Sequence, residues 1–328
     1  MKYYEVDEKL NEIGLAIFML IIGIAAIIYC ANVAVKNSLI LASSLGVSNL
    51  VIGVSMVSIG TDIPEIVNSI ISCYLGHGDI DVGDSVGSIL AQITLIFGLL
   101  VIICGTIKVG RKEMFIIGGC QILALILIFT VIEKGYFTRF DALFMIGSFV
   151  VYLMVIQNVL KSDLLEKVDM MELTENFRSK KYHFTLAALA FIGVAISSYV
   201  IIYSIISLSS TLGLHEYIIA FFILGIGTSL PELAVDINAI KKKQYDLAIG
   251  DIVGSCIVDA SISIAIGQLL FPQNVTTELA IPTILYTICV SIVVVVVVGV
   301  REKVDKKAAV LFISLYFGSY LILFSVLI

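Results

Sequence analysis

The sequence predicts an all-α polytopic membrane protein of ten transmembrane helices, arranged as two inverted-topology repeats of five helices each. Three observations predict this fold. Apolar segments of about 18 or more residues, the length that a helix needs to cross a bilayer, recur along the whole chain. One stretch occurs twice, as residues 60–92 and 227–259. Sixteen of the 20 lysines and arginines fall in alternate loops, so the second half enters the membrane upside down relative to the first.

The composition is that of a protein embedded in lipid. Apolar residues make up 59% of the 328 residues and charged residues 14%, and the mean hydropathy is +1.09. A soluble domain is about half apolar and about a quarter charged. The bilayer is therefore the expected partner, and nothing indicates a nucleic-acid partner, an obligate protein partner, a cofactor or an enzyme's catalytic residues. The net charge of −6 says little about partners, because most charges lie in short loops.

Ten spans follow a short polar tail, residues 1–11, and the first apolar run is long enough to be a full span rather than a cleavable signal peptide. The predicted spans are residues 12–34, 42–73, 80–106, 113–132, 139–160, 183–208, 214–240, 247–270, 279–300 and 307–328. They divide into a first repeat (1–160), a charged linker (161–182) and a second repeat (183–328). The linker is the only long charged stretch and is expected to be an amphipathic surface helix or a flexible connection.

The positions of the basic residues also predict an orientation in the cell membrane. The linker side carries 16 of them and the opposite side only Lys2, Lys9, Lys134 and Arg139. Cytoplasmic loops are the ones enriched in lysine and arginine. Both termini are therefore expected to be extracellular and the central linker cytoplasmic.

The duplicated stretch holds two motifs that align without a gap at an offset of 167 residues. Eleven of the 33 aligned positions are identical, among them Gly60 with Gly227 and Glu65 with Glu232. Each copy places a proline and a carboxylate inside an apolar span. An inverted duplication with interrupted helices is typical of secondary transporters and indicates their binding site.

Pro64 and Pro231 should each break or kink a helix, because proline lacks an amide hydrogen and clashes with the preceding turn. The break frees backbone carbonyls near Thr61 and Thr228. Such irregular backbone is tolerated at membrane depth only where it is buried in protein or lines a polar cavity. A lone proline would be an ordinary transmembrane kink, but here the two occur symmetrically, each one residue before a glutamate.

The oxygen donors of the two motifs indicate a site for a hard cation. A charge at mid-membrane costs roughly 2.5–3.5 kcal/mol on the insertion scale, so four carboxylates without a lysine or arginine cost on the order of 10 kcal/mol. Cations or protons must offset that cost. Ca²⁺ takes roughly 6–8 oxygen ligands in flexible geometry, whereas Mg²⁺ needs a tighter octahedron. The candidate ligands are Glu65, Glu232, Asp259, Asp62, Thr61, Thr228, Ser229, Ser88, Ser255 and Gln92.

The two motifs resemble the alpha repeats of the sodium/calcium exchanger family, in its prokaryotic form. The pattern G-T-x-[LI]-P-E followed by G-x-x-x-G-S-x-x-x-[ND] is highly specific, and the resemblance covers essentially the whole chain. It implies an antiporter that moves Ca²⁺ against Na⁺ by alternating access. It also implies that Glu65 and Glu232 are the central carboxylates and Asp259 the acid of the second repeat. The hydroxyl residues named above correspond to the family's oxygen ligands.

The chain departs from the family pattern at several positions. Asp62 stands where serine is usual, Gln92 where asparagine is usual, and Asp84 and Asp251 where asparagine is usual. The extra acid at Asp62 leads to the hypothesis of an altered ion stoichiometry, or of a proton among the bound cations. H⁺/Ca²⁺ exchange, or exchange of another divalent cation, is therefore the alternative to Na⁺/Ca²⁺ exchange. Asp84 and Asp251 could equally cap their helices or belong to the site.

Three further interpretations compete with the exchanger. A single buried glutamate could serve only as a hydrogen-bonding group between helices. The pairs Gly83–Asp84 and Gly250–Asp251 faintly resemble the G-x-G-D element of intramembrane aspartyl proteases, although positions 81 and 248 lack its first glycine. A passive cation channel would differ from an antiporter in needing no counter-ion on the opposite side. Asp236, four residues after Glu232, shares its helix face and could line an ion pathway.

Overall fold

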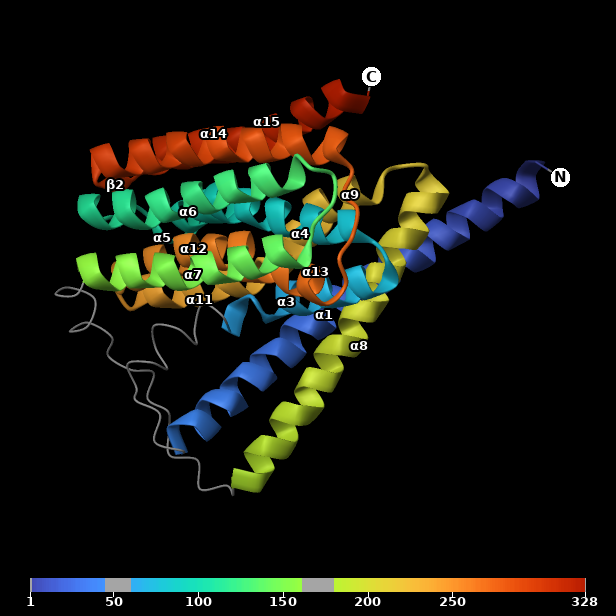
Figure 1. Ribbon diagram of the computed structural model, residues 1–328, viewed down its shortest axis with the longest axis horizontal. Coiled ribbons are helices and arrows are strands. Elements are labelled where there is room, and N and C mark those ends of the chain that lie inside the picture. The colour runs from blue at the N-terminus through green and yellow to red at the C-terminus, as the bar shows by residue number, and fades with distance from the viewer. Residues whose placement is uncertain (1, 45–59, 161–179, 328) are drawn as a thin grey trace.

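Long apolar helices make up almost all of the described structure, a computed structural model that describes residues 2–44, 60–160 and 180–327 (Figure 1). Within these residues, nine helices are long and apolar enough to cross a membrane. The first half comprises α1 (Lys2–Ser44), α3 (Ile63–Leu75), α4 (Gly78–Leu90), the π-helical segment η1 (Ala91–Ile96), α5 (Phe97–Cys104), β1 (Ile107–Lys108), α6 (Arg111–Ile132) and α7 (Arg139–Leu160).

The second half repeats the order of the long helices. It comprises α8 (Lys180–Leu212), α9 (Glu216–Ile219), η2 (Ala220–Leu224), α10 (Gly225–Thr228), α11 (Leu230–Lys241), α12 (Tyr245–Val258), η3 (Asp259–Ser263), α13 (Ile264–Leu270), α14 (Thr277–Arg301), β2 (Lys303–Val304) and α15 (Lys306–Leu327). However, β2 follows α14, whereas β1 precedes α6. The segments η2 and η3, like η1, are π-helical and continue the helices on either side of them.

Nine of the predicted spans coincide with these helices. The main difference is in α1, which runs well beyond the predicted range 12–34 at both ends, while α8 exceeds 183–208 by about one turn at each end. The predicted span 42–73 falls partly outside the described residues, and its described part continues as α3 to Leu75. The predicted linker 161–182 also lies outside them, except that its last residues, 180–182, belong to α8.

The offset of 167 residues extends from the motifs to the whole fold. Helices α7 and α15 begin at Arg139 and Lys306, which differ by 167. β1 pairs with β2 in an antiparallel ribbon that matches Lys108 with Lys303. An isolated bridge joins Tyr136 to Asn274, the positions equivalent to residues 303 and 107. The ribbon and the bridge are thus equivalent contacts, one at each end of the pseudo-symmetric structure.

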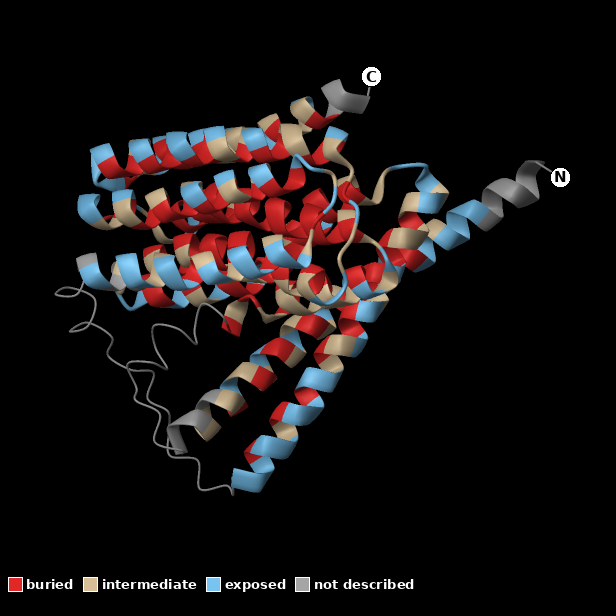
Figure 2. Ribbon diagram, in the orientation of Figure 1, coloured by how far each residue is buried: buried red, intermediate tan, exposed pale blue. Residues whose placement is uncertain are grey.

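The long helices α1 and α8 pack on each other at the edge of the bundle (Figure 1). Much of their surface is exposed, as Figure 2 shows for the part that extends away from the bundle, and many of the exposed side chains are apolar. Phe18 and Ile21 of α1 and Phe184 and Ile196 of α8 are all more than 60% exposed. Exposed apolar side chains of this kind face lipid in a membrane protein. The expectation that the first and sixth spans are peripheral agrees with this arrangement.

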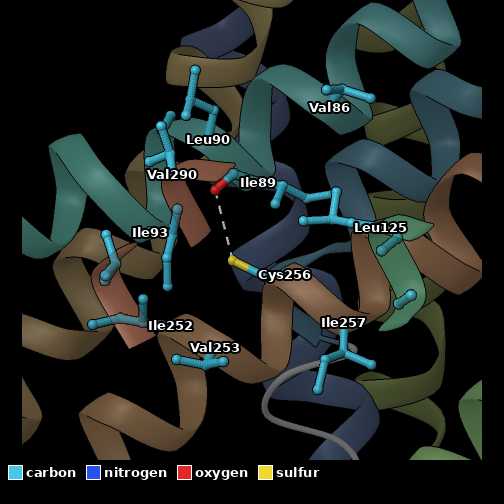
Figure 3. Packing of buried hydrophobic residues seen from close by; sticks show 14 of the residues in the cluster. Val86, Ile89, Leu90, Ile93, Leu125, Ile252, Val253, Cys256, Ile257 and Val290 are labelled. Carbon is cyan, nitrogen blue, oxygen red and sulfur yellow. Dashed lines mark hydrogen bonds between the residues drawn. The ribbon is translucent and has the colours of Figure 1, made fainter. Parts of the chain in front are cut away.

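The core forms where the two repeats cross. Val86, Ile89 and Ile93 of the first repeat interdigitate with Val253 and Cys256 of the second (Figure 3). The Cys256 thiol donates to the carbonyl oxygen of Ile89 at 3.8 Å, and these two residues are equivalent positions at the 167-residue offset. The pseudo-two-fold axis therefore passes between α4–η1 and α12–η3, at the second motifs.

Two glycines allow the repeats to approach this closely. A Cβ placed on Gly87 would lie 2.1 Å from the carbonyl oxygen of Phe221, and one on Gly225 would lie 2.6 Å from the carbonyl carbon of Gly87. Both neighbours are backbone atoms, which cannot move aside as a side chain can. The crossing of α4 with η2 and α10 is consequently a backbone-to-backbone contact, as is common where small residues line helix interfaces in membranes.

We predict that Gly87→Ala destabilises the protein, because the added methyl group would force α4 away from Phe221. Overpacking of this kind costs typically about 1–3 kcal/mol and more against rigid backbone. Thermal unfolding of the detergent-solubilised protein measures the effect. Gly119→Ala in α6 is the matched control, since no atom lies within 4 Å of its Cβ position. Equal unfolding temperatures for the two variants would contradict the proposed crossing.

Candidate functional site

The first motifs of the two repeats are interrupted helices, as the prolines predict. In the second repeat α10 ends at Thr228 and α11 begins at Leu230, with Pro231 in its first turn. Ser229 between them has φ −83° and ψ 4°, and the equivalent Asp62 has φ −83° and ψ 7°. Both residues thus leave helical geometry at the same point. The glutamates stand in the first turn of the helices that follow, where the helix dipole favours a negative charge.

The two breaks bring three carboxylates together. One oxygen each from Asp62, Glu65 and Glu232 lies within 4.8 Å of the other two, and all three side chains are buried. Asp259, from the second motif, is also buried and is close enough to interact electrostatically with Asp62 and Glu65. We refer to these four residues as the central cluster.

Most oxygens of the central cluster lack a hydrogen-bond donor. Both carboxylate oxygens of Asp62, Glu65 and Glu232, and one of Asp259, have no hydrogen-bonding partner with suitable geometry among the described residues. Burying an ionised carboxylate without a compensating partner costs several kcal/mol. Like charges at this separation add repulsion to that cost. The cluster is therefore strongly electronegative and requires cations or protons.

The second motifs meet through their last residues. The Gln92 amide donates to Asp259 Oδ2 at 3.2 Å, and the Cys256 thiol donates to Gln92 Oε1 at 3.2 Å. Gln92 and Asp259 are equivalent positions, so this contact lies on the pseudo-two-fold axis. Both stand in π-helical segments, η1 and η3. Such bulges are frequent at functional sites and re-aim side chains by widening a turn. The residues of the two motifs do not predict these π-helical bulges.

Hydroxyl groups surround the carboxylates. The hydroxyls of Ser229 and Thr228 donate to carbonyls of their own helix, at 2.7 Å to Gly225 and 3.0 Å to Leu224. Ser88 and Thr228, from different repeats, have their Oγ atoms 3.3 Å apart. A hydroxyl that donates its hydrogen keeps its oxygen lone pairs available for a cation.

The two remaining hydroxyl candidates differ in their surroundings. Ser255 is buried and its Oγ has no partner among the described residues. Thr61 is half-buried and lies beside Glu232. The structure therefore connects the other predicted ligand residues through contacts among the two pairs of motifs, while Ser255 is buried on α12 between Asp251 and Asp259 in sequence. Only Asp62, Glu65 and Glu232 offer carboxylate oxygens within 4.8 Å of one another.

Asp84 and Asp251 are not helix caps. Each stands six residues inside its helix, since α4 begins at Gly78 and α12 at Tyr245. Asp84 accepts a hydrogen bond from Asn68 Nδ2 at 3.1 Å. Thr228 Oγ1 lies 3.3 Å from Asp84 Oδ1 and can donate its one hydrogen either there or to the Leu224 carbonyl. Ser198 of α8 in turn donates to Asn68 Oδ1 at 2.7 Å. The sequence did not indicate Asn68 and Ser198, because their role depends on helices that are distant in the chain.

The arrangement suits a hard cation rather than acid–base catalysis. Its donors are carboxylates, hydroxyls and one amide, and among the described residues the cluster of potential metal ligands contains no histidine or cysteine. Oxygen-only sites of this kind bind Ca²⁺ or Na⁺ in preference to Zn²⁺. A cation at the central cluster would satisfy the oxygens that lack donors.

We predict that Ca²⁺ raises the thermal unfolding temperature of the purified protein and that Glu232→Gln largely abolishes this rise. A ligand present at 100 times its dissociation constant stabilises by about 2.7 kcal/mol. In calcium-free buffer the same variant should be more stable than the wild type, because one uncompensated buried charge is gone. Asp305→Asn is the control, since this half-buried carboxylate, between β2 and α15, pairs with Arg301 and is far in sequence from both motifs. A calcium response in Glu232→Gln equal to that of the wild type would argue against the site.

Relatives in two microorganisms share most of their length with this chain. Inner membrane protein YrbG of Escherichia coli is 27% identical over 270 residues, which cover 80% of this chain and 82% of YrbG. The uncharacterized membrane protein MJ0091 of Methanocaldococcus jannaschii is 26% identical over 309 residues, which cover 93% of this chain and 96% of MJ0091.

Solved structures share the fold. The H⁺/Ca²⁺ exchanger CAX superposes with a TM-score of 0.73 at 15% identity, covering 95% of this chain and 84% of CAX. The sodium-calcium exchanger NCX_Mj superposes with a TM-score of 0.59 at 24% identity, covering 94% of this chain and 98% of NCX_Mj. These likenesses confirm the predicted fold of ten transmembrane helices in two inverted repeats.

The sequence also matches a protein family twice, once in each half. Residues 15–157 and residues 182–325 both match the family described as sodium/calcium exchanger protein. Together the two matches cover most of the chain, and they include both copies of the motif pair. The chain belongs to the sodium/calcium exchanger family.

Proposed function

We propose that this protein is a secondary-active antiporter that exchanges Ca²⁺ against Na⁺ across the membrane by alternating access. The observation that carries the proposal is the central cluster, in which four buried carboxylates have most of their oxygens without donors. Membership of the sodium/calcium exchanger family supports the identity of the ions. Transport needs neither a resident cofactor nor covalent chemistry at this site.

In this mechanism Glu65 and Glu232 bind the divalent ion from opposite sides. Asp62 joins them, since its carboxylate lies within the same group of close oxygens. Asp259 and Gln92 complete a flanking position for a monovalent ion, together with the hydroxyls of Thr61, Thr228, Ser229, Ser88 and Ser255. Two smaller charges can replace one divalent charge against the same set of carboxylates, which gives a physical basis for exchange.

The proposal extends to the membrane orientation and the moving parts. Both termini are extracellular and the 161–182 segment is a cytoplasmic linker between repeats 1–160 and 183–328, following the distribution of basic residues. The peripheral pair α1 and α8 slides against the bundle to change which side the central cluster faces. Its exposed apolar surface supports this, because side chains that face lipid do not hold the pair in place, and the bond from Ser198 to Asn68 is the contact that such a movement would have to break.

Exchange against H⁺ is the second candidate, and Asp62 favours it. An additional carboxylate beside Glu65 and Glu232 increases the repulsion that must be neutralised when Ca²⁺ leaves. A proton can neutralise it as readily as Na⁺ can. The likeness to CAX, whose structure is that of an H⁺/Ca²⁺ exchanger, is one of fold alone and leaves the choice of coupling ion to experiment.

The protease and channel interpretations have less support. Because the chain belongs to a family of exchangers, the intramembrane protease hypothesis is set aside. That hypothesis would make Asp84 the catalytic acid. Its carboxylate instead accepts a hydrogen bond from Asn68 and lies beside the Thr228 hydroxyl. One property distinguishes a passive channel from an antiporter. A channel conducts Ca²⁺ without a counter-ion on the opposite side.

Uptake of ⁴⁵Ca²⁺ into proteoliposomes tests the exchange. One set carries an outward Na⁺ gradient, and another an outward H⁺ gradient with no Na⁺ present. We predict Na⁺-driven uptake that falls at least tenfold in Glu65→Gln, because one central charge is missing. Uptake that is independent of any counter-ion would indicate a channel and contradict the proposal. Proton-driven uptake alone would establish the second candidate.

Asp62→Ser tests the role of the additional acid. We predict that this variant still transports Ca²⁺ but changes its dependence on the counter-ion, because the central cluster has one negative charge fewer to neutralise. The measurement is the Na⁺ concentration for half-maximal Ca²⁺ release from loaded proteoliposomes, compared at two pH values. A Na⁺ dependence identical to that of the wild type at both pH values would exclude Asp62 from the coupling.

A further inference from the structure

One face of α3 is covered by the peripheral helices, and the equivalent face of α11 is not. Ile63, Val67 and Ile71 lie four residues apart on this face of α3 and pack against the apolar cluster to which α1 and α8 contribute. Their equivalents at the offset of 167 residues are all exposed: Leu230, Ala234 and Asn238 of α11. Helix α8 packs along α3, whereas the described residues of α1 have no comparable contact with α11. The two repeats are therefore arranged differently around the same core.

This difference is expected of an inverted-repeat transporter in one access state, with its site open to one side of the membrane. Because a pseudo-two-fold axis relates the repeats, exchanging their arrangements generates the opposite state. In that opposite state α1 would lie along α11, and α8 would leave α3. A contact that holds α8 against α3 therefore favours the present state over its counterpart. The inference rests on the proposed function for the existence of this second state.

A buried hydrogen bond joins α8 to α3 at their contact. The Ser198 hydroxyl donates to Asn68 Oδ1 at 2.7 Å, and neither side chain is more than 1% exposed. The Asn68 amide nitrogen donates to Asp84 Oδ2 at 3.1 Å. The orientation of the amide follows from these partners, because an ionised carboxylate only accepts hydrogen bonds and the amide nitrogen only donates them. The amide oxygen is thus the atom that faces Ser198.

This chain of bonds ends beside the candidate ligands of the cation site. Thr228 Oγ1 lies 3.3 Å from Asp84 Oδ1 and 3.3 Å from Ser88 Oγ. Thr228 and Ser88 both belong to the ten predicted ligands. Asn68 therefore connects the peripheral helix α8 to an acid in contact with the site. Withdrawing Ser198 would take from the buried amide oxygen a donor whose loss carries a free-energy cost.

The second repeat has no equivalent of this hydrogen bond. At the offset of 167 residues Ser198 corresponds to Ala31 of α1, and Asn68 corresponds to Val235 of α11. Neither alanine nor valine has a side-chain donor or acceptor. In the opposite state, where Ala31 and Val235 would take the places of Ser198 and Asn68, this contact is apolar. The hydrogen bond is thus available to one access state and absent from the other.

We propose that Ser198 and Asn68 are positioning residues that form a latch, a hydrogen bond that holds α8 on α3 and raises the population of the present access state. Neither residue is among the ten predicted ligands, and neither needs to touch the ion. One net hydrogen bond changes an equilibrium by roughly two- to tenfold. The latch therefore biases the two states without preventing the change between them. Its connection through Asp84 to Thr228 gives the ion site a physical route to α8.

Hydrogen–deuterium exchange of the purified full-length protein in lipid nanodiscs, without Na⁺ or Ca²⁺, tests the latch in Ser198→Ala. We expect the amides of α3 to exchange roughly two- to tenfold faster than in the wild type, because α8 leaves α3 more often. We expect those of α11 to exchange more slowly, because α1 covers α11 more often. Ser204→Ala is the matched control, since this buried hydroxyl of the same helix donates within α8, to the Val200 carbonyl at 2.7 Å.

The opposite changes in α3 and α11 distinguish a latch from a bond that only stabilises the fold. Faster exchange in α3 without slower exchange in α11 would overturn the proposal, as would faster exchange in both helices or no change in either. The same pair of opposite changes in Ser204→Ala would also overturn it. Because no ion gradient is used, a negative result leaves the exchange of Ca²⁺ against Na⁺ untouched. Absence of Na⁺-driven uptake in proteoliposomes would in turn leave the opposite changes in α3 and α11 as evidence for the latch.

Discussion

The structure depends on the cost of holding carboxylates away from water without partners. Asp62, Glu65 and Glu232 converge in the protein interior, and their oxygens accept no well-formed hydrogen bond from the described residues. A soluble protein would place lysine or arginine beside such a group, or leave it at the surface. Here the balancing charge has to come from ions that enter and leave, so the instability of the empty site is the basis of its affinity.

The rest of the fold positions the acids of the central cluster close to one another. The breaks at Asp62 and Ser229 free the chain from helical geometry and start new helices with a glutamate in the first turn. Backbone contact at Gly87 and Gly225 lets the repeats cross closely enough for acids from both to meet. The apolar packing around Ile89 and Cys256 holds this crossing rigid (Figure 3). In the proposed mechanism the movement falls to the peripheral helices α1 and α8, whose exposed surface is largely apolar.

The sequence predicted the fold, and it singled out acids that the structure brings close together, because both depend on local patterns. Apolar length gave the spans, and Pro64 and Pro231 gave the breaks that the structure contains. The rest depends on contacts between distant segments. The hydrogen bonds to Asp84 come from other helices. The motif around Asp84 matches the motif around Asp251, so the sequence alone does not separate the surroundings of the two acids. The π-helical segments η1 and η3 likewise reflect packing at the pseudo-two-fold axis, since their residues resemble those of ordinary helices.

The central claim is that a cation occupies the space between Asp62, Glu65 and Glu232. Crystals of the protein soaked in Ca²⁺, with diffraction data collected at a wavelength where calcium scatters anomalously, test it most directly. The account predicts an anomalous peak between these three side chains, at about 2.3–2.6 Å from their carboxylate oxygens. Well-ordered carboxylates with no anomalous peak between them at saturating Ca²⁺ would contradict it.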